Sequence, residues 1–159
     1  MQRVARSLRR PIAPERAWAE ATSPEGINDE LMPLVKMTMP KRLRGRELDQ
    51  FPIGTPPGRS LILLFGLIPI DYDDLCIAEL EPPRRFLERS RTLTFAVWEH
   101  ERVIEADDGG CVLTDRLGFE LKDPLRRLPG AGRLARAIVA ALFARRHRRL
   151  RRRDTARHE

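Results

Sequence analysis

Alternating apolar and polar positions dominate the second half of the chain and predict a series of β-strands. Period-two alternation over short runs that end at Pro, Gly or Asp is typical of antiparallel strands. Residues 2–10 and 35–39 show the same pattern, so we expect six to seven strands in all. The runs in the second half are residues 60–65, 71–80, 86–94, 98–105 and 111–121.

The Asp108-Gly109 dipeptide lies between the last two runs and predicts a two-residue hairpin turn. A turn there places Glu101 opposite Arg116, a pair of opposite charges that favours this register. The other face gathers the apolar residues, so we expect it to face the core and to carry His100, Arg102 and Asp115 inward. The cross-strand pairs on that face are Trp98 with Phe119, His100 with Leu117, Arg102 with Asp115, and Ile104 with Leu113.

Helical spacing is confined to three places. Two short helices follow the first strand, because Pro14 suits a first helical position and Ser23 before Pro24 is a good N-cap. A long helix is expected over residues 131–152, and its first half can cover the sheet. Its apolar stripe has Leu134, Ile138 and Leu142 on one line, Ala135, Val139 and Phe143 beside it, and Leu150 as its continuation. We expect its last two turns to project past the core. Residues 40–58, rich in Pro and Gly, are expected to form a loop.

Composition and charge describe one globular domain with a basic end. The chain has 159 residues, 42% hydrophobic and 33% charged, and we expect a single domain over residues 1–153. Its net charge is +7, but residues 144–159 contain eight arginines and only two acids, so the remainder carries +1. Arginine outnumbers lysine by 27 to 3, a bias also typical of GC-rich genomes.

Cysteine content and the absence of a leader pattern predict a cytoplasmic protein. Cys76 and Cys111 are the only cysteines and form no C-x-x-C, which excludes a disulfide framework and a structural zinc site. The longest apolar run, residues 61–70, is about half the length of a membrane-spanning helix. The first ten residues lack the apolar stretch of a secretory signal.

The order of elements, a strand, two short helices, about six strands and one long helix, resembles the START-like or helix-grip superfamily. This superfamily includes lipid-transfer domains and aromatic polyketide cyclases. The local strings Trp98-x-His100-x-Arg102 and Leu113-Thr114-Asp115, and the stretch from Pro14 to Trp18, are similar to a bacterial ligand-binding branch. So are Leu142-Phe143 and the segment 146–150. The resemblance implies an α+β fold in which a curved antiparallel sheet wraps around the C-terminal helix, with an apolar pocket between them.

We therefore expect the protein to bind a hydrophobic small molecule, such as a lipid, an aromatic or a polyketide-like compound, without catalysis and without a cofactor. His100 and Arg102 are expected to meet a polar end of the ligand, although a buried Arg102–Asp115 pair beside a hydrogen-bonded histidine is a structural alternative, in which Glu88 could join. The expected wall residues are Trp18, Met37, Met39, Trp98, Phe119, Leu134, Ile138 and Leu142.

A cyclase or dehydratase, with His100 or Asp115 moving protons, is the alternative function. Other kinds of catalytic or metal site have little support. A Ser-His-Asp triad could be assembled from Ser60 or Ser90, but no G-x-S-x-G elbow exists. His100, His147 and His158 are widely separated and lack metal-ligand spacing, phosphate-binding glycine motifs are absent, and Asp71, Asp73 and Asp74 lack the EF-hand pattern.

The arginine-rich end, residues 144–159, has several interpretations. Solvated arginines at a helix C-terminus are favoured by the helix dipole. Contact with an anionic surface is an alternative, which would make the segment an interaction module. Nucleic acid is not expected, because no aromatic residue follows Phe143. The arginines that could make the anionic contact are Arg145, Arg146, Arg148, Arg149, Arg151, Arg152 and Arg153.

Overall fold

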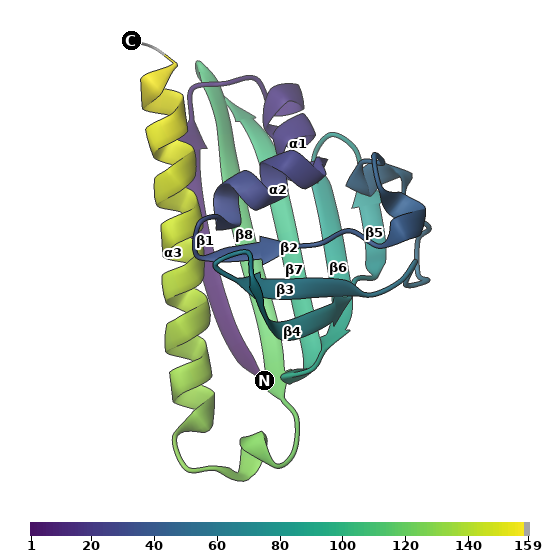
Figure 1. The fold of residues 1–159 in the computed structure, drawn as a ribbon. Helices are drawn as coiled ribbons and strands as arrows, with labels where there is room; N and C mark the ends of the chain where they lie inside the picture. The colour runs from purple at the N-terminus through teal and green to yellow at the C-terminus, as the bar shows by residue number, and fades with distance from the viewer. Residues whose placement is uncertain (158–159) are drawn as a thin grey trace.

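The computed structural model describes residues 1–157 as a curled antiparallel sheet with three helices, shown in Figure 1. The spatial order of the strands is β1-β8-β7-β6-β4-β3-β2, and β5 pairs with β6 beside this path. This is the α+β, helix-grip arrangement that the sequence predicts. The strands are β1 (Gln2–Arg10), β2 (Val35–Met37), β3 (Ser60–Leu64), β4 (Ile68–Asp74), β5 (Ile77–Glu81), β6 (Arg85–Thr92), β7 (Phe95–Asp107) and β8 (Gly110–Leu121). The helices are α1 (Pro14–Thr22), α2 (Pro24–Leu31) and α3 (Ala131–Ala156), with short 3-10 turns η1 (Lys41–Leu43), η2 (Leu48–Gln50) and η3 (Leu125–Arg127).

The β7–β8 hairpin has the predicted register. The chain reverses at Asp108-Gly109, where Gly109 has a φ of 77° that suits glycine. On the outer face, Arg116 donates a hydrogen bond of 2.9 Å to Glu101. On the inner face, Arg102 pairs with Asp115, and the pairs around them are those expected from the turn position. The inward placement of His100, Arg102 and Asp115 is therefore confirmed.

The two short helices begin where the sequence predicts. Pro14 and Pro24 occupy the first turns of α1 and α2, and the Ser23 side chain accepts a hydrogen bond from the Gly26 amide at 3.0 Å. In Figure 1 both helices cover the upper part of the concave face. Trp18 of α1 is buried there and packs edge-on against Phe86 of β6.

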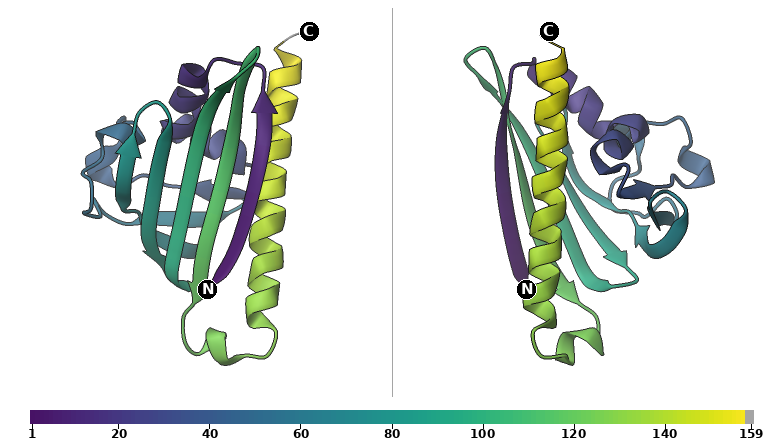
Figure 2. Two further views of the ribbon diagram at one scale, coloured as in Figure 1. Left: turned by 180° about the vertical axis from the view of Figure 1, so that it is seen from behind. Right: turned by 60° about the vertical axis from the view of Figure 1, so that its left-hand side comes forward.

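The long helix α3 lies along β1 and also contacts α2, as Figure 2 shows from two further sides. It is four residues longer than expected, and of the predicted apolar stripe the buried part is Ala135, Val139, Phe143 and Leu150. Leu134 and Ile138 do not cover the sheet but are 63% and 59% exposed. The last two turns do not project past the core either. The buried line of α3 is Ala135, Val139, Phe143, Arg146, His147, Leu150 and Asp154.

The single strand expected over residues 71–80 is divided in two. β4 pairs with the end of β6 at Thr92, whereas β5 pairs with its beginning, from Arg85 to Glu88. Leu75 and Cys76 lie between the two strands, and the Cys76 amide donates to Ser90 Oγ at 3.1 Å. This break lets the sheet curl, so β2, β3 and β4 cross in front of the concave face in Figure 1.

The apolar interior consists of two groups separated by polar residues. One lies under α1 and α2 and includes Trp18, Phe86 and Leu150; we call it the α1–α2 core. The other lies between α3 and the other end of the sheet, around Phe119 and Phe143. The candidate site occupies the boundary between the two groups and the second group itself.

Candidate functional site

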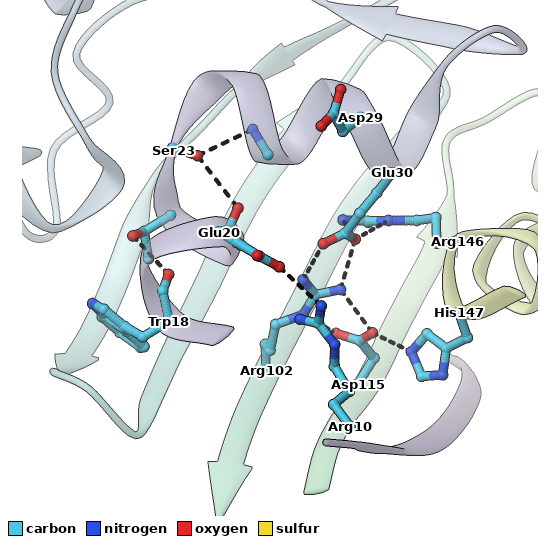
Figure 3. A network of polar contacts seen from close by, with 12 residues as sticks. Arg10, Trp18, Glu20, Ser23, Asp29, Glu30, Arg102, Asp115, Arg146 and His147 are labelled. Atoms are coloured by element: carbon cyan, nitrogen blue, oxygen red, sulfur yellow. Dashed lines mark hydrogen bonds and ion pairs between the residues drawn. The ribbon is translucent and has the colours of Figure 1, made fainter. Parts of the chain in front are cut away.

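Asp115 of β8 is the centre of a fully buried polar network (Figure 3). Its Oδ1 accepts a hydrogen bond of 2.7 Å from Arg102 Nε and lies 2.7 Å from His100 Nε2. Its Oδ2 accepts from Arg102 Nη2 at 2.9 Å and is 2.7 Å from His147 Nε2 on α3. Because the protein already occupies both oxygens, the Asp115 carboxylate is not available to take a proton from a ligand.

Arg102 of β7 connects this carboxylate to a second one. Its Nη1 and Nη2 donate to the two oxygens of Glu30 on α2, at 2.8 and 3.0 Å. Arg146 of α3 donates to the same Glu30 from its Nε at 3.0 Å. Arg102 thus makes four hydrogen bonds to two carboxylates, a bidentate geometry that only arginine provides. The network joins the sheet, α2 and α3, and these donors of Arg102 are engaged within the protein.

A second buried pair closes the other end of α3. Arg10, at the end of β1, donates to both oxygens of Asp154 at 2.8 Å and to Glu20 of α1 at 2.9 Å. Figure 3 draws the hydrogen bond between Arg10 and Glu20. The arginine side chain is 1% exposed, so its charge depends on these carboxylates for compensation.

The charges of the network set the protonation states of its acids. Burial by itself would raise the pKa of Glu30, but the charges of Arg102 and Arg146 lower it to about 2. Burial also opposes ionisation of Asp115, yet Arg102 and the two histidines hold its pKa well below the ordinary value. Both groups are therefore carboxylates at neutral pH, and each is balanced by arginine.

His100 extends the network towards β4. Burial tends to lower its pKa, but the hydrogen bond to Asp115 and the proximity of Glu88 raise it above the ordinary value. Its Nδ1 is 3.8 Å from Glu88 Oε2, and Glu88 accepts a hydrogen bond of 2.8 Å from Ser90 Oγ. Burial and the neighbouring Glu88 raise the pKa of Asp73 well above its ordinary value. The expectation that Glu88 joins the network is confirmed.

The lowered pKa of Glu30 predicts a loss of stability in acid. The folded-state pKa is about 2 against an ordinary 4.5, so the contribution of Glu30 is complete above pH 4.5 and is lost as pH falls towards 2. We expect the free energy of unfolding of Glu30→Gln to vary less with pH in this window than that of the wild type. Urea denaturation at a series of pH values measures both slopes. Equal slopes would contradict the assignment of the low pKa to Glu30.

An aromatic cluster of Phe95, Trp98 and Phe119 lies beyond this network on the concave face. Ring centroids are 5.3 Å apart for Phe95–Trp98 and 5.9 Å apart for Trp98–Phe119. Phe119 is buried, whereas Phe95 and Trp98 are only partly covered. A hollow of about 200 Å³ adjoins Phe119, between the sheet and the first turn of α3. Its lining residues are Met1, Gln2, Phe119, Glu120, Leu121, Arg126 and Gly132.

The expected wall residues fall into three groups. Trp18, Met37, Met39 and Leu142 belong to the α1–α2 core or pack against it. Trp98 and Phe119 belong to the aromatic cluster. Leu134 and Ile138 lie on the exposed face of α3 next to the line that meets the sheet. Only the second and third groups are near uncovered apolar surface.

The arginine-rich end is only partly exposed. Contrary to the expectation, Arg146 is not free for an external anion, because it is buried against Glu30. Arg153 is within 3.3 Å of Asp29. Arg148, Arg151 and Arg152 are exposed. His158 lies outside the described residues.

Among the residues that the structure describes, no group of three or more His, Cys, Asp or Glu side chains is placed to hold a metal ion. Within residues 1–157, no helix combines the length and the apolar composition that crossing a membrane requires.

The sequence pattern does not predict the burial of three members of the network. Glu30 lies on a short helix among polar residues, and Arg146 and His147 lie in a run of arginines, so each has the pattern of a solvated side chain. One signal was present in the sequence: Leu150 continues the apolar line of α3 past Arg146 and His147, which places both residues beside the buried face.

Solved structures with the same arrangement define the class of fold. Protein CV1439 from Chromobacterium violaceum superposes with a TM-score of 0.69 at 13% identity, covering 94% of this chain and 95% of that one. A START superfamily protein from Mycobacterium smegmatis gives 0.60 at 10% identity, covering 97% of both chains. DynU16, a protein of the dynemicin biosynthetic locus, gives 0.56 at 15% identity, covering 95% of this chain and 48% of that one. The fold is therefore START-like.

The family is shown by sequence. Residues 9–153 match the model of the family described as "Domain of unknown function (DUF8410)", and the chain belongs to this family. The search of curated proteins finds no match.

Proposed function

We propose that this protein binds a hydrophobic small molecule, such as a lipid, an aromatic or a polyketide-like compound, over the aromatic cluster on the concave face. The observation that carries the proposal is the partial exposure of Phe95 and Trp98, two neighbouring aromatic side chains on the inner face of the sheet. An aromatic surface left open inside a curled sheet is suited to an apolar ligand, and the adjoining hollow adds space beside Phe119.

The exposed apolar residues of α3 support the same location. Leu134 and Ile138 precede Leu142 and Arg145 on one side of the helix, and Arg145 reaches the Met32 carbonyl at the end of α2. Leu134 and Ile138 thus continue, beyond the end of α2, the side of α3 that α2 covers. Val139, next to Ile138, packs in the group that contains the aromatic cluster. These two residues are placed to form the second wall of a groove.

The Ile138→Asp substitution introduces a negative charge at the groove and should weaken ligand binding without disturbing the core. We expect this exposed substitution to weaken the binding of oleic acid, 2-methoxynaphthalene or a hydroxyanthraquinone at least tenfold, because a ligand would have to desolvate the new carboxylate. Fluorescence titration measures the effect. The Trp18→Phe background leaves Trp98 as the sole tryptophan, so its emission reports on the groove and not on the α1–α2 core.

Ile53→Asp is the matched control, since Ile53 is 58% exposed and Ile138 is 59% exposed, but Ile53 lies in the loop beside β5. It should bind as the wild type does. If none of the probes changes Trp98 emission saturably, or if both aspartate variants bind equally, the groove is not the binding site. Native mass spectrometry of the purified protein would identify any ligand that it retains.

A contact with an anionic surface is a second candidate, favoured by the exposure of Arg148, Arg151 and Arg152 along one end of α3. Three guanidinium groups on successive turns would attract acidic lipid headgroups. In this proposal, the arginine-rich end brings the protein to a membrane surface, while the groove holds the apolar molecule.

A further inference from the structure

Two buried polar groups on the concave face have no role in the fold described above. Ser60 of β3 and Asp73 of β4 are cross-strand partners, and they are 0% and 7% exposed. Among residues 1–157, neither Ser60 Oγ nor Asp73 Oδ1 has a hydrogen-bond partner. A buried polar atom without a partner costs stability, so two of them side by side call for an explanation.

The pair lies next to the aromatic cluster. Asp73 is the cross-strand partner of Thr92 on β6, and Ser90, one inward position earlier on that strand, is the partner of Trp98 on β7. Neighbouring strands are about 4.8 Å apart, and Ser90 is two residues from Thr92 along β6, so Asp73 lies roughly 12 Å from Trp98 across the sheet. A fused two-ring aromatic with a hydroxyl, packed with one end against the Trp98 side chain, spans most of this distance.

The charges around the pair favour an uncharged ligand group. Burial and the Glu88 carboxyl raise the pKa of Asp73, which favours its neutral form, and the raised pKa of His100 favours the imidazolium form beside Glu88. Glu88 and His100 then compensate each other. An anionic headgroup would meet two carboxyl groups, and a cation would find the nearest carboxylate already paired.

We propose that Ser60 and Asp73 bind the hydroxyl group of an otherwise apolar ligand, such as a phenol or an alcohol. The ligand hydroxyl donates to Asp73 Oδ1, and its oxygen accepts a hydrogen bond from Ser60 Oγ. One hydroxyl group, which both donates and accepts, then satisfies both unpartnered atoms. This inference rests on the proposed function and specifies the class of ligand.

Four probes with one ring system test the proposal by isothermal titration calorimetry on the full chain. They are 2-naphthol, 2-methoxynaphthalene, the anionic 2-naphthoate and the cationic 2-naphthylmethylammonium. We expect 2-naphthol to bind about tenfold more tightly than 2-methoxynaphthalene, because only the former can donate to Asp73. The two charged probes should bind more weakly than 2-naphthol.

Ser60→Ala removes one of the two partners, and we expect it to reduce the preference for 2-naphthol at least threefold. The variant should fold, since the hydroxyl it removes has no partner in the protein; a thermal melt checks this. Thr22→Val is the matched control. It also removes a fully buried hydroxyl, but one that donates to the Trp18 carbonyl within α1. Its preference for 2-naphthol should equal that of the wild type.

The outcomes separate the inference from the proposed function. If all four probes bind with similar affinity, or if Ser60→Ala keeps the full preference, the pair only holds water and the inference is wrong while the groove stands. Tighter binding of the cation or the anion also overturns it, because the site would then be charged. If no probe binds to the wild type, both the inference and the proposed groove are wrong.

Discussion

Arg102→Met lowers the free energy of unfolding by about 3–5 kcal/mol, because it leaves the Glu30 and Asp115 carboxylates buried without their shared partner. Methionine fills a similar volume, so the loss measures charge and hydrogen bonding and not a cavity. Urea denaturation followed by circular dichroism gives the difference. It would be a large fraction of the stability of an ordinary domain, which is about 5–15 kcal/mol.

Arg116→Met is the matched control on the other face of the same hairpin. Arg116 pairs with Glu101, but its side chain is 60% exposed, so we expect a loss below about 1 kcal/mol. Combining Arg102→Met with Asp115→Asn should recover part of the stability, since the Asp115 charge that loses Arg102 is then removed, while Glu30 keeps its pairing with Arg146. Equal losses for Arg102→Met and Arg116→Met would mean that the buried network does not stabilise the fold.

Truncation after residue 144 has a still larger expected effect: the shortened chain should not fold. It loses Leu150 from the α1–α2 core, Arg146 from Glu30 and Asp154 from Arg10. Each loss costs about 2–5 kcal/mol, so together they are comparable with the whole stability of a domain. Far-UV circular dichroism and a thermal melt test this. A cooperative transition in the truncated chain would show that the end of α3 is dispensable for the core.

A triple variant with Arg148, Arg151 and Arg152 replaced by alanine is the control for the truncation. These side chains are exposed, so the variant should fold like the wild type. It also tests the anionic contact, because its binding to vesicles containing phosphatidylserine should be weaker than that of the wild type in a sedimentation assay. Unchanged vesicle binding would rule out a role for these three arginines.

The part of the fold that the sequence specifies best is the β7–β8 hairpin. A two-residue Asp-Gly turn leaves one register, and that register determines which side chains point inward. The inward position of His100, Arg102 and Asp115 follows from local information alone. The hydrogen-bond partners of these side chains do not follow from local information, because Glu30 and His147 lie on helices far away along the chain.

The side of α3 that faces the sheet shows the limit of periodicity. Leu134 and Ile138 form one apolar line, and Ala135, Val139 and Phe143 form another one residue further on, so either line could face the sheet. The second line is buried, and charged residues continue it towards the C-terminus. Hydrophobic pattern alone counts such residues as solvent-exposed, and only the carboxylates that they meet make their burial favourable.

The Arg10–Asp154 pair has a consequence for folding kinetics. It joins residues 144 positions apart, and β1 pairs with β8, the last strand of the sheet, so both ends of the chain are fixed by contacts of very long sequence separation. Closing such loops costs entropy before any contact compensates for it, and chains of this kind fold in milliseconds to seconds and not in microseconds. Until β1 and the end of α3 have met, the apolar inner face of the β6–β8 meander remains open to water and to other unfinished chains.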